Sequence, residues 1–126
     1  MNDDQMVEAL NELRDVLHKD AKANGWHDNP NAETAYVAKT VANLHGEVSE
    51  LWESYRNASF RGLCDKADDM QQNGIDPLTC CEEEMADIII RVLDSCGRLG
   101  INIGRSVKSK AAYNRTRSYR HGGKLA

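Results

Sequence analysis

The 126-residue chain has only two prolines, few aromatic residues and no long apolar run. An aromatic content of 6% beside 29% charged residues is typical of helical proteins rather than β-sheet proteins. No stretch approaches the roughly 20 apolar residues of a membrane span, and the start MNDDQMVEAL lacks the basic and apolar regions of a signal peptide. We therefore expect one soluble, intracellular, all-α domain.

Several motifs that bind cofactors are also missing. The four cysteines form no C-x-x-C pair, which disfavours a zinc site, and a chain of this size needs no disulfide bond to fold. No histidine completes the Glu-x-x-His spacing of di-iron carboxylate bundles, so redox iron is excluded. Glycine motifs for phosphate or dinucleotide binding are absent as well.

The C-terminal end of the sequence contains no acidic residue. All 20 acidic residues lie at or before Asp94, whereas residues 105–126 hold seven cations and no anion. The body therefore carries a net charge of −11 and the tail +7. Either the two parts contact each other, or both bind one anionic ligand, the acidic part through a metal ion.

Apolar residues recur with a helical period and predict four helices. Their approximate ranges are 3–23, 32–57, 76–99 and 103–114. In the second helix the apolar positions are four and three residues apart, which is typical of a bundle or coiled-coil seam. The connection between the second and third helices has no sustained period, and we expect at most one helical turn in it.

The ends of these helices carry recognisable signals. Asn24 and Gly25 suit the end of the first helix, and Pro30 prevents its continuation. Thr79 and Glu82 form the T-x-x-E pattern of a capping box at the start of the third helix. The apolar arc of this third helix covers about 140° of its surface, so it must contact more than one neighbour. We expect it at the centre of a bundle or in a subunit interface, and expect a homo-oligomer.

Two pairs of carboxylates stand three residues apart on the long helices. Glu47 and Glu50 lie in the second helix, and Glu84 and Asp87 lie in the third. If the helices pack through their apolar seams, the four groups can meet at one place, and carboxylates without imidazole or thiolate favour Mg²⁺ or Mn²⁺. The alternative is a solvated, ion-paired surface in which Arg91 pairs with Glu84 or Asp87.

Three segments in this order, HGEVSELWE, EEMADIIIRVLD and KAAYNRTRSYRHGGK, resemble the MazG-like all-α nucleoside triphosphate pyrophosphohydrolases. The resemblance covers the chain from about Trp26 to its end and is closest to small single-domain members from phages and bacteria. It implies one domain over residues 1–126, a four-helix bundle with a basic C-terminal tail, and a homodimer or homotetramer that associates through its helices. The 33 residues between the two acidic motifs, and Ser118 in the tail, depart from the family pattern.

The resemblance also implies roles for individual residues. Glu47, Glu50, Glu84 and Asp87 would hold Mg²⁺, with Mn²⁺ as a possible substitute, and a metal-bound water would attack the α-phosphorus of the substrate. Lys110, Asn114 and Arg117 would contact the phosphates. The implied substrates are deoxynucleoside triphosphates, with dATP or dGTP as the leading expectation, and the products are the monophosphate and pyrophosphate.

Recognition of the base is the least determined part of this hypothesis. The candidates for stacking are Trp26, His27, His45, Trp52 and Tyr113, and each is equally suited to packing. We select Trp26 and Tyr113 as substrate-binding candidates.

A second hypothesis is a helical module that binds nucleic acid through its basic tail. Seven cations predict salt-sensitive binding without sequence preference, although the acidic body would repel the same phosphate backbone. A third is a purely structural assembly bundle, for which Mg²⁺ would have no effect. We favour the hydrolase, acting on a small-molecule nucleotide in the bacterial or phage-infected host cytoplasm, with neither nucleic acid nor membrane as a partner.

Overall fold

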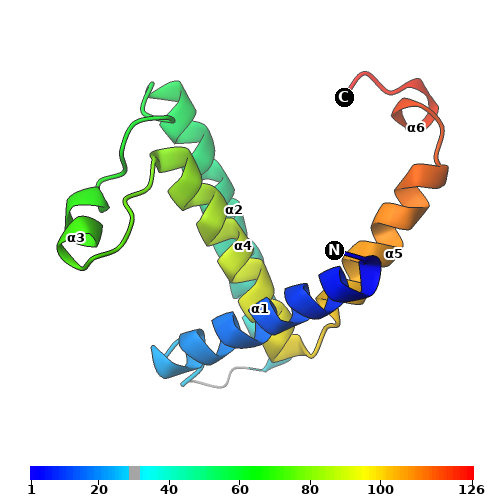
Figure 1. The fold of residues 1–126 in the computed structure, drawn as a ribbon, viewed down its shortest axis with the longest axis horizontal. Helices are drawn as coiled ribbons and strands as arrows, with labels where there is room; N and C mark the ends of the chain where they lie inside the picture. The colour runs from blue at the N-terminus through cyan, green and yellow to red at the C-terminus, as the bar shows by residue number, and fades with distance from the viewer. Residues whose placement is uncertain (29–31) are drawn as a thin grey trace.

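The computed structural model describes residues 1–28 and 32–126, and the expectation of an all-α fold is confirmed for them. The described residues form six helices: α1 Asp3–Ala23, α2 Glu33–Arg56, α3 Ala67–Gln72, α4 Cys80–Leu99, α5 Ile103–Thr116 and α6 Arg120–Gly123 (Figure 1). Their only β contact is a single bridge between Leu63 and Thr79. No helix in the described ranges has the length and apolar character needed to cross a membrane.

The four predicted helices are confirmed, with small differences at their ends. The connection after α2 contains α3, a helix of six residues and thus longer than the single turn expected there. The last predicted helix runs on to Thr116, and the short α6 lies in the tail, where no helix was expected. The prediction that Pro30 prevents continuation of the first helix lies outside the described residues.

The capping box predicted at the start of α4 is confirmed, and α1 carries one that was not predicted. Oγ1 of Thr79 accepts a hydrogen bond from the Glu82 backbone N–H, and the Thr79 backbone N–H donates to Oε1 of Glu82, which completes a capping box on α4. Asn2 and Gln5 form the same arrangement on α1. Gly100 ends α4 with a φ of +68°, a left-handed conformation that glycine adopts without strain.

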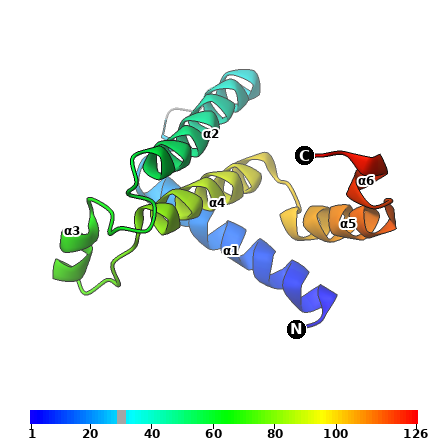
Figure 2. The ribbon, with the colours of Figure 1, turned by 90° about the horizontal axis from the view of Figure 1, so that it is seen from above.

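Helix α4 is the centre of the packing, because α2 lies along it and α1 crosses it (Figures 1 and 2). The chain direction reverses between α2 and α4, so these two helices are antiparallel (Figure 1). Gly97 allows the crossing with α1, since a side chain there would overlap the ring of His18. Helix α5 packs on α1 through Gly104, where a Cβ would overlap the Val7 carbonyl, and then leads away from α2 and α4 (Figure 1).

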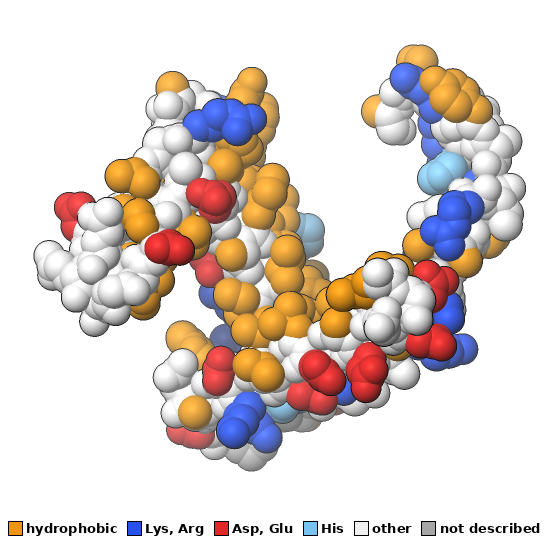
Figure 3. Space-filling model, in the orientation of Figure 1, with side chains coloured by type: hydrophobic (Ala, Val, Ile, Leu, Met, Phe, Trp, Pro, Cys, Tyr) orange, Lys and Arg blue, Asp and Glu red, His pale blue; other side chains and the backbone are white. Residues whose placement is uncertain are grey.

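A single chain buries few apolar side chains. Among the described residues the buried ones are Tyr36, Cys64, Ala67, Leu93 and Cys96. Long apolar side chains remain exposed along α2 and α4, and they form bands on the space-filling surface (Figure 3). The exposed members on these two helices are Val37, Val41, Val48, Trp52, Tyr55, Met85, Ile89 and Ile90. The open arrangement of helices therefore leaves apolar faces without cover.

Candidate functional site

The antiparallel packing of α2 and α4 brings the predicted carboxylates together. Glu47, Glu50 and Glu84 each offer an oxygen, and these oxygens lie within 4.8 Å of one another. Asp87 follows Glu84 on the same side of α4, and the charge of Glu47 helps to raise its pKa. Three of the four carboxylates in the two acidic pairs thus converge within 4.8 Å of one another, and Asp87 lies one helical turn further along α4.

The cluster is partly buried, and two of its oxygens have no hydrogen-bond partner. The side chain of Glu47 is 11% exposed. The Oε2 atoms of Glu47 and Glu84 are buried and receive no hydrogen bond. A buried carboxylate oxygen without a partner is costly, and most such atoms in proteins are satisfied by a donor or a cation. These two atoms therefore mark a place where a cation would be stabilised.

Burial and the crowding of like charges raise the pKa of two carboxyl groups in the cluster. Burial raises the pKa of Glu84 to about 7, and a hydrogen bond with Glu50 and the charges of Glu50, Glu83 and Asp87 contribute to the rise. Burial likewise raises the pKa of Asp87, with further contributions from Glu47 and Glu83. In the absence of a metal ion, Glu84 therefore holds a proton below about pH 7.

Two cations from the body of the protein adjoin this cluster. Arg91 donates a hydrogen bond of 2.7 Å from Nε to Oε1 of Glu47, so its partner is neither of the two acids that the solvated-surface alternative assigned to it. Lys66 pairs with Glu83, and its charge lowers the pKa of Asp87. Arg91 was expected beside these acids, although with another partner, whereas Lys66 was not. Lys66 lies in the connection between α2 and α4, where no periodic pattern marks a residue that reaches the acidic cluster.

Backbone hydrogen bonds hold the connection carrying Lys66 against the start of α4. Cys64 donates to the Leu78 carbonyl, and Cys80 donates to the Gly62 carbonyl, each at 2.9 Å. These two bonds attach the segment just before Lys66 to the first residues of α4. The position of Lys66 beside the acidic cluster therefore follows from local backbone structure.

The donor set matches a hard divalent cation. Four carboxylates offer only oxygen ligands, which suit Mg²⁺ and Mn²⁺ better than zinc or copper. The buried oxygens without partners, on Glu47 and Glu84, would be satisfied by such an ion. By its chemistry the cluster fits the expected magnesium site.

A cavity of about 820 Å³ extends from this cluster along α2 and α4 to the end of α1. Glu47 and Asp87 form part of its wall, and Trp26 lines it as a side chain that is 76% exposed. From α2 it is lined by Lys39, Thr40 and Asn43. Sequence reasoning missed these three residues, although Lys39 and Asn43 precede Glu47 by eight and four positions and so share its side of the helix.

The substrate-binding residues predicted in the basic tail do not lie at the carboxylate cavity of the same chain. Lys110, Tyr113 and Asn114 belong to α5, Arg117 follows it, and none of them lines the cavity. The Lys110 ammonium and the Arg117 guanidinium lie 5.0 Å and 5.8 Å from the centre of the Tyr113 ring. One chain therefore brings Trp26 to the carboxylate cavity but does not bring the tail cations there.

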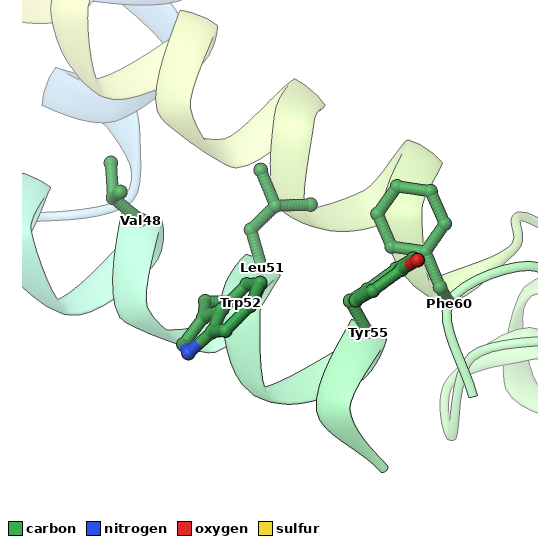
Figure 4. A pocket seen from close by; sticks show the side chains of 5 residues that line it. All are labelled: Val48, Leu51, Trp52, Tyr55 and Phe60. Atoms are coloured by element: carbon green, nitrogen blue, oxygen red, sulfur yellow. The ribbon is translucent and has the colours of Figure 1, made fainter. Parts of the chain in front are cut away.

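A second hollow on α2 is apolar throughout. Val48, Leu51, Trp52, Tyr55 and Phe60 line about 330 Å³ of it (Figure 4). The rings of Trp52 and Tyr55 are stacked with their centres 6.0 Å apart, and Phe60 meets Tyr55 edge-on. Trp52 is thus placed in an apolar surface rather than in the carboxylate cavity.

No family model, curated protein or solved structure matches this chain.

Proposed function

We propose that this protein is a MazG-like, Mg²⁺-dependent nucleoside triphosphate pyrophosphohydrolase. The observation that carries the proposal is the meeting of Glu47, Glu50 and Glu84, with buried oxygens on two of them that lack any partner. A solvated, ion-paired surface would leave such oxygens in water or bound to a cation. The polar cavity that begins at these groups gives a substrate access to them.

In the proposed reaction the carboxylates bind the metal ion, and the neighbouring cations reduce the negative charge of the cluster. Glu47, Glu50, Glu84 and Asp87 would hold Mg²⁺, which when bound screens the triphosphate charge and acidifies water. Arg91 and Lys66 reduce the remaining negative charge of the cluster. One of these carboxylates would accept the proton of the attacking water. The products are a nucleoside monophosphate and pyrophosphate.

The cavity has room for the nucleoside part of a substrate. Its volume of about 820 Å³ lies within the range of small-molecule sites in proteins. Trp26 offers an aromatic face for stacking, and Asn43 offers an amide that can both donate to and accept from the edge of a base. We propose a purine deoxynucleoside triphosphate, dATP or dGTP, as the substrate, drawn from the cytoplasmic nucleotide pool.

We further propose that a second copy of the chain completes a four-helix bundle and covers the exposed apolar faces of α2 and α4. Large exposed apolar patches mark association surfaces. In a homodimer or homotetramer, α5 of one chain can approach the carboxylates of its partner. Lys110, Asn114 and Arg117 would then contact the phosphates, and Tyr113 the substrate, across the interface.

Product analysis of the purified protein with Mg²⁺ and each of the eight common nucleoside triphosphates tests the activity. We expect pyrophosphate and monophosphate, with the highest rate for a purine deoxynucleotide. Glu47→Gln should reduce this turnover at least about 100-fold, because it removes a charged metal ligand. Glu53→Gln is the matched control on the same helix, since Glu53 is exposed and pairs with Arg56. Release of orthophosphate, or unchanged turnover in Glu47→Gln, would contradict the proposal.

One observation favours the nucleic-acid module as a second candidate. Helix α5 packs on α1, where Lys108 pairs with Asp4, but the later part of α5 and α6 lead away from α2 and α4 and leave the end of the tail accessible (Figures 1 and 3). A tail-driven module would bind DNA or RNA with strong salt dependence, and Glu47→Gln would keep or increase this affinity. Nucleic-acid binding together with no hydrolysis of any nucleotide would favour this candidate over the enzyme.

A further inference from the structure

A second group of potential ligands lies at the other end of the cavity. Nδ1 of His18 lies 2.8 Å from Oδ1 of Asp94, and Nε2 of His27 lies 2.8 Å from the same oxygen. The three donor atoms, one from each residue, lie within 4.8 Å of one another. The two imidazole rings meet edge to face with centres 4.8 Å apart. Two nitrogens and a carboxylate thus converge on one point.

Three different segments hold this group in a largely buried position. His18 belongs to α1, His27 follows α1, and Asp94 belongs to α4. Their side chains are 18%, 10% and 17% exposed. Gly97 leaves room for the His18 ring where α1 crosses α4. His27 and Asp94 also line the large cavity, so one side of the group is open to a further ligand.

We propose that His18, His27 and Asp94 form a second metal site, selective for zinc. Two imidazoles and one carboxylate are a common protein ligand set for catalytic or accessible zinc, and a water or a cavity-bound molecule takes the fourth position. Ligand atoms that lie about 2.0–2.1 Å from a tetrahedral zinc ion are roughly 3.4 Å from one another. Each imidazole nitrogen now lies 2.8 Å from Oδ1 of Asp94. Zinc binding would therefore need each nitrogen to move away from Oδ1 by about half an ångström. The carboxylate cluster has no nitrogen donor and favours Mg²⁺, so the two sites differ in metal preference.

Arg98 determines how tightly the ion is held. Its Nη1 lies 3.5 Å from Nδ1 of His27, and its guanidinium lies 3.8 Å from the centre of the Tyr36 ring. When Nε2 of His27 binds zinc, the ring of neutral His27 carries its proton on Nδ1, which then needs an acceptor. Arginine offers only donors, so Arg98 must move aside, and its present place weakens the site.

The bound ion would attach the end of α1 and the following residues to α4. Trp26 is the neighbour of His27 in sequence and lines the same cavity, so the site would limit the movement of Trp26. Zinc would therefore stabilise the cavity wall opposite the carboxylates. This inference does not depend on the proposed hydrolase activity.

The test is titration of the purified full-length chain with Zn²⁺ by calorimetry and with Co²⁺ by visible absorption. We expect one ion per chain at this site, the absorption of four-coordinate cobalt with nitrogen ligands, and a Tm that rises with Zn²⁺. His18→Ala and His27→Ala should each weaken Zn²⁺ binding by more than about tenfold. His45→Ala is the matched control, because His45 is exposed on α2 and lies outside the group. Circular dichroism verifies that each variant is folded.

Arg98→Gln gives a result that a purely structural hydrogen-bond network does not predict. Glutamine can accept from Nδ1 of His27, so we expect tighter zinc binding than in the unchanged chain. The proposal is overturned if Zn²⁺ does not bind. It is also overturned if binding survives both histidine substitutions and is instead lost in Glu50→Gln, which would place the ion at the carboxylates.

Discussion

Arg91 and Glu47 form a hydrogen-bonded ion pair of 2.7 Å across the contact between α4 and α2. The arginine occupies Oε1 of Glu47, while Oε2 is buried without a partner. One carboxylate therefore has a protein partner on one side and a place for a cation on the other. Arg91 also competes with any ion that binds both oxygens.

Substitution of Arg91 should make the stability of the protein more dependent on Mg²⁺. In Arg91→Ala the buried charge of Glu47 loses its partner, and the free energy of unfolding without metal should fall by about 1–3 kcal/mol. Mg²⁺ can restore part of this loss, so the rise in Tm on its addition should exceed that of the unchanged chain. Thermal unfolding with and without Mg²⁺ measures both quantities. An equal rise in the two proteins would contradict a metal ion beside Glu47.

The raised pKa of Glu84 should make the metal-free protein less stable at neutral pH than in mild acid. The pKa of Glu84 is about 7 in the folded chain against an ordinary value of 4.5 for a glutamate, so the folded state binds more protons between these values. The contribution of Glu84 is fully present below about pH 4.5 and is lost as the pH rises through 7. Urea unfolding at several pH values should show this loss, and Glu84→Gln should remove it. Since Mg²⁺ binds the ionised form, its affinity should rise over the same interval.

Two glycines on different helices should respond in opposite ways to alanine. A Cβ at Gly104 would overlap the backbone of Val7, so Gly104→Ala must push α5 away from α1 and should cost about 1–3 kcal/mol. Gly46 has open space around it within α2, and Gly46→Ala should stabilise the chain by up to about 1 kcal/mol through helix propensity. Urea midpoints of the two variants provide the comparison. Equal effects would mean that α5 does not pack on α1 at this point.

Blocking the cavity should separate recognition of the nucleoside from cleavage of phosphates. Under the proposed function, Thr40→Trp places a bulky ring among the lining residues and should raise the KM for dATP at least about tenfold, whereas Mg²⁺-dependent hydrolysis of inorganic tripolyphosphate should change little. Ala38→Trp, on the same helix but outside the lining, is the control. An unchanged KM for dATP in Thr40→Trp would show that the nucleoside binds elsewhere, even if the enzyme is active.

The features that could be predicted from the sequence are those set by local periodicity. The ranges of the long helices and the capping box of Thr79 depend on neighbouring residues, and both are confirmed. The proximity of Glu47 and Glu84 could also be predicted from the sequence, because two apolar seams that pack together define which carboxylates face each other. Spacing alone could not distinguish a partly buried carboxylate cluster from a solvated, ion-paired surface, since burial of single oxygens depends on tertiary packing.

The remaining features depend on contacts between segments without a repeating pattern. Lys66 reaches the cluster through backbone bonds of an aperiodic connection, and no periodicity marks such a position. His27 meets Asp94 across 67 positions of sequence, and a histidine without a motif gives no indication of its partner. The direction of α5 is set by the contact of Gly104 with Val7, which requires knowledge of the crossing of two helices.

The small number of buried apolar residues has a consequence for how the protein behaves on dilution. If a second copy covers α2 and α4, as proposed, the chain gains part of its stability from association rather than from folding alone. Its folded fraction should therefore depend on its own concentration. Specific activity should then fall in dilute samples, and in a cell the protein would act only after its synthesis has passed a threshold amount.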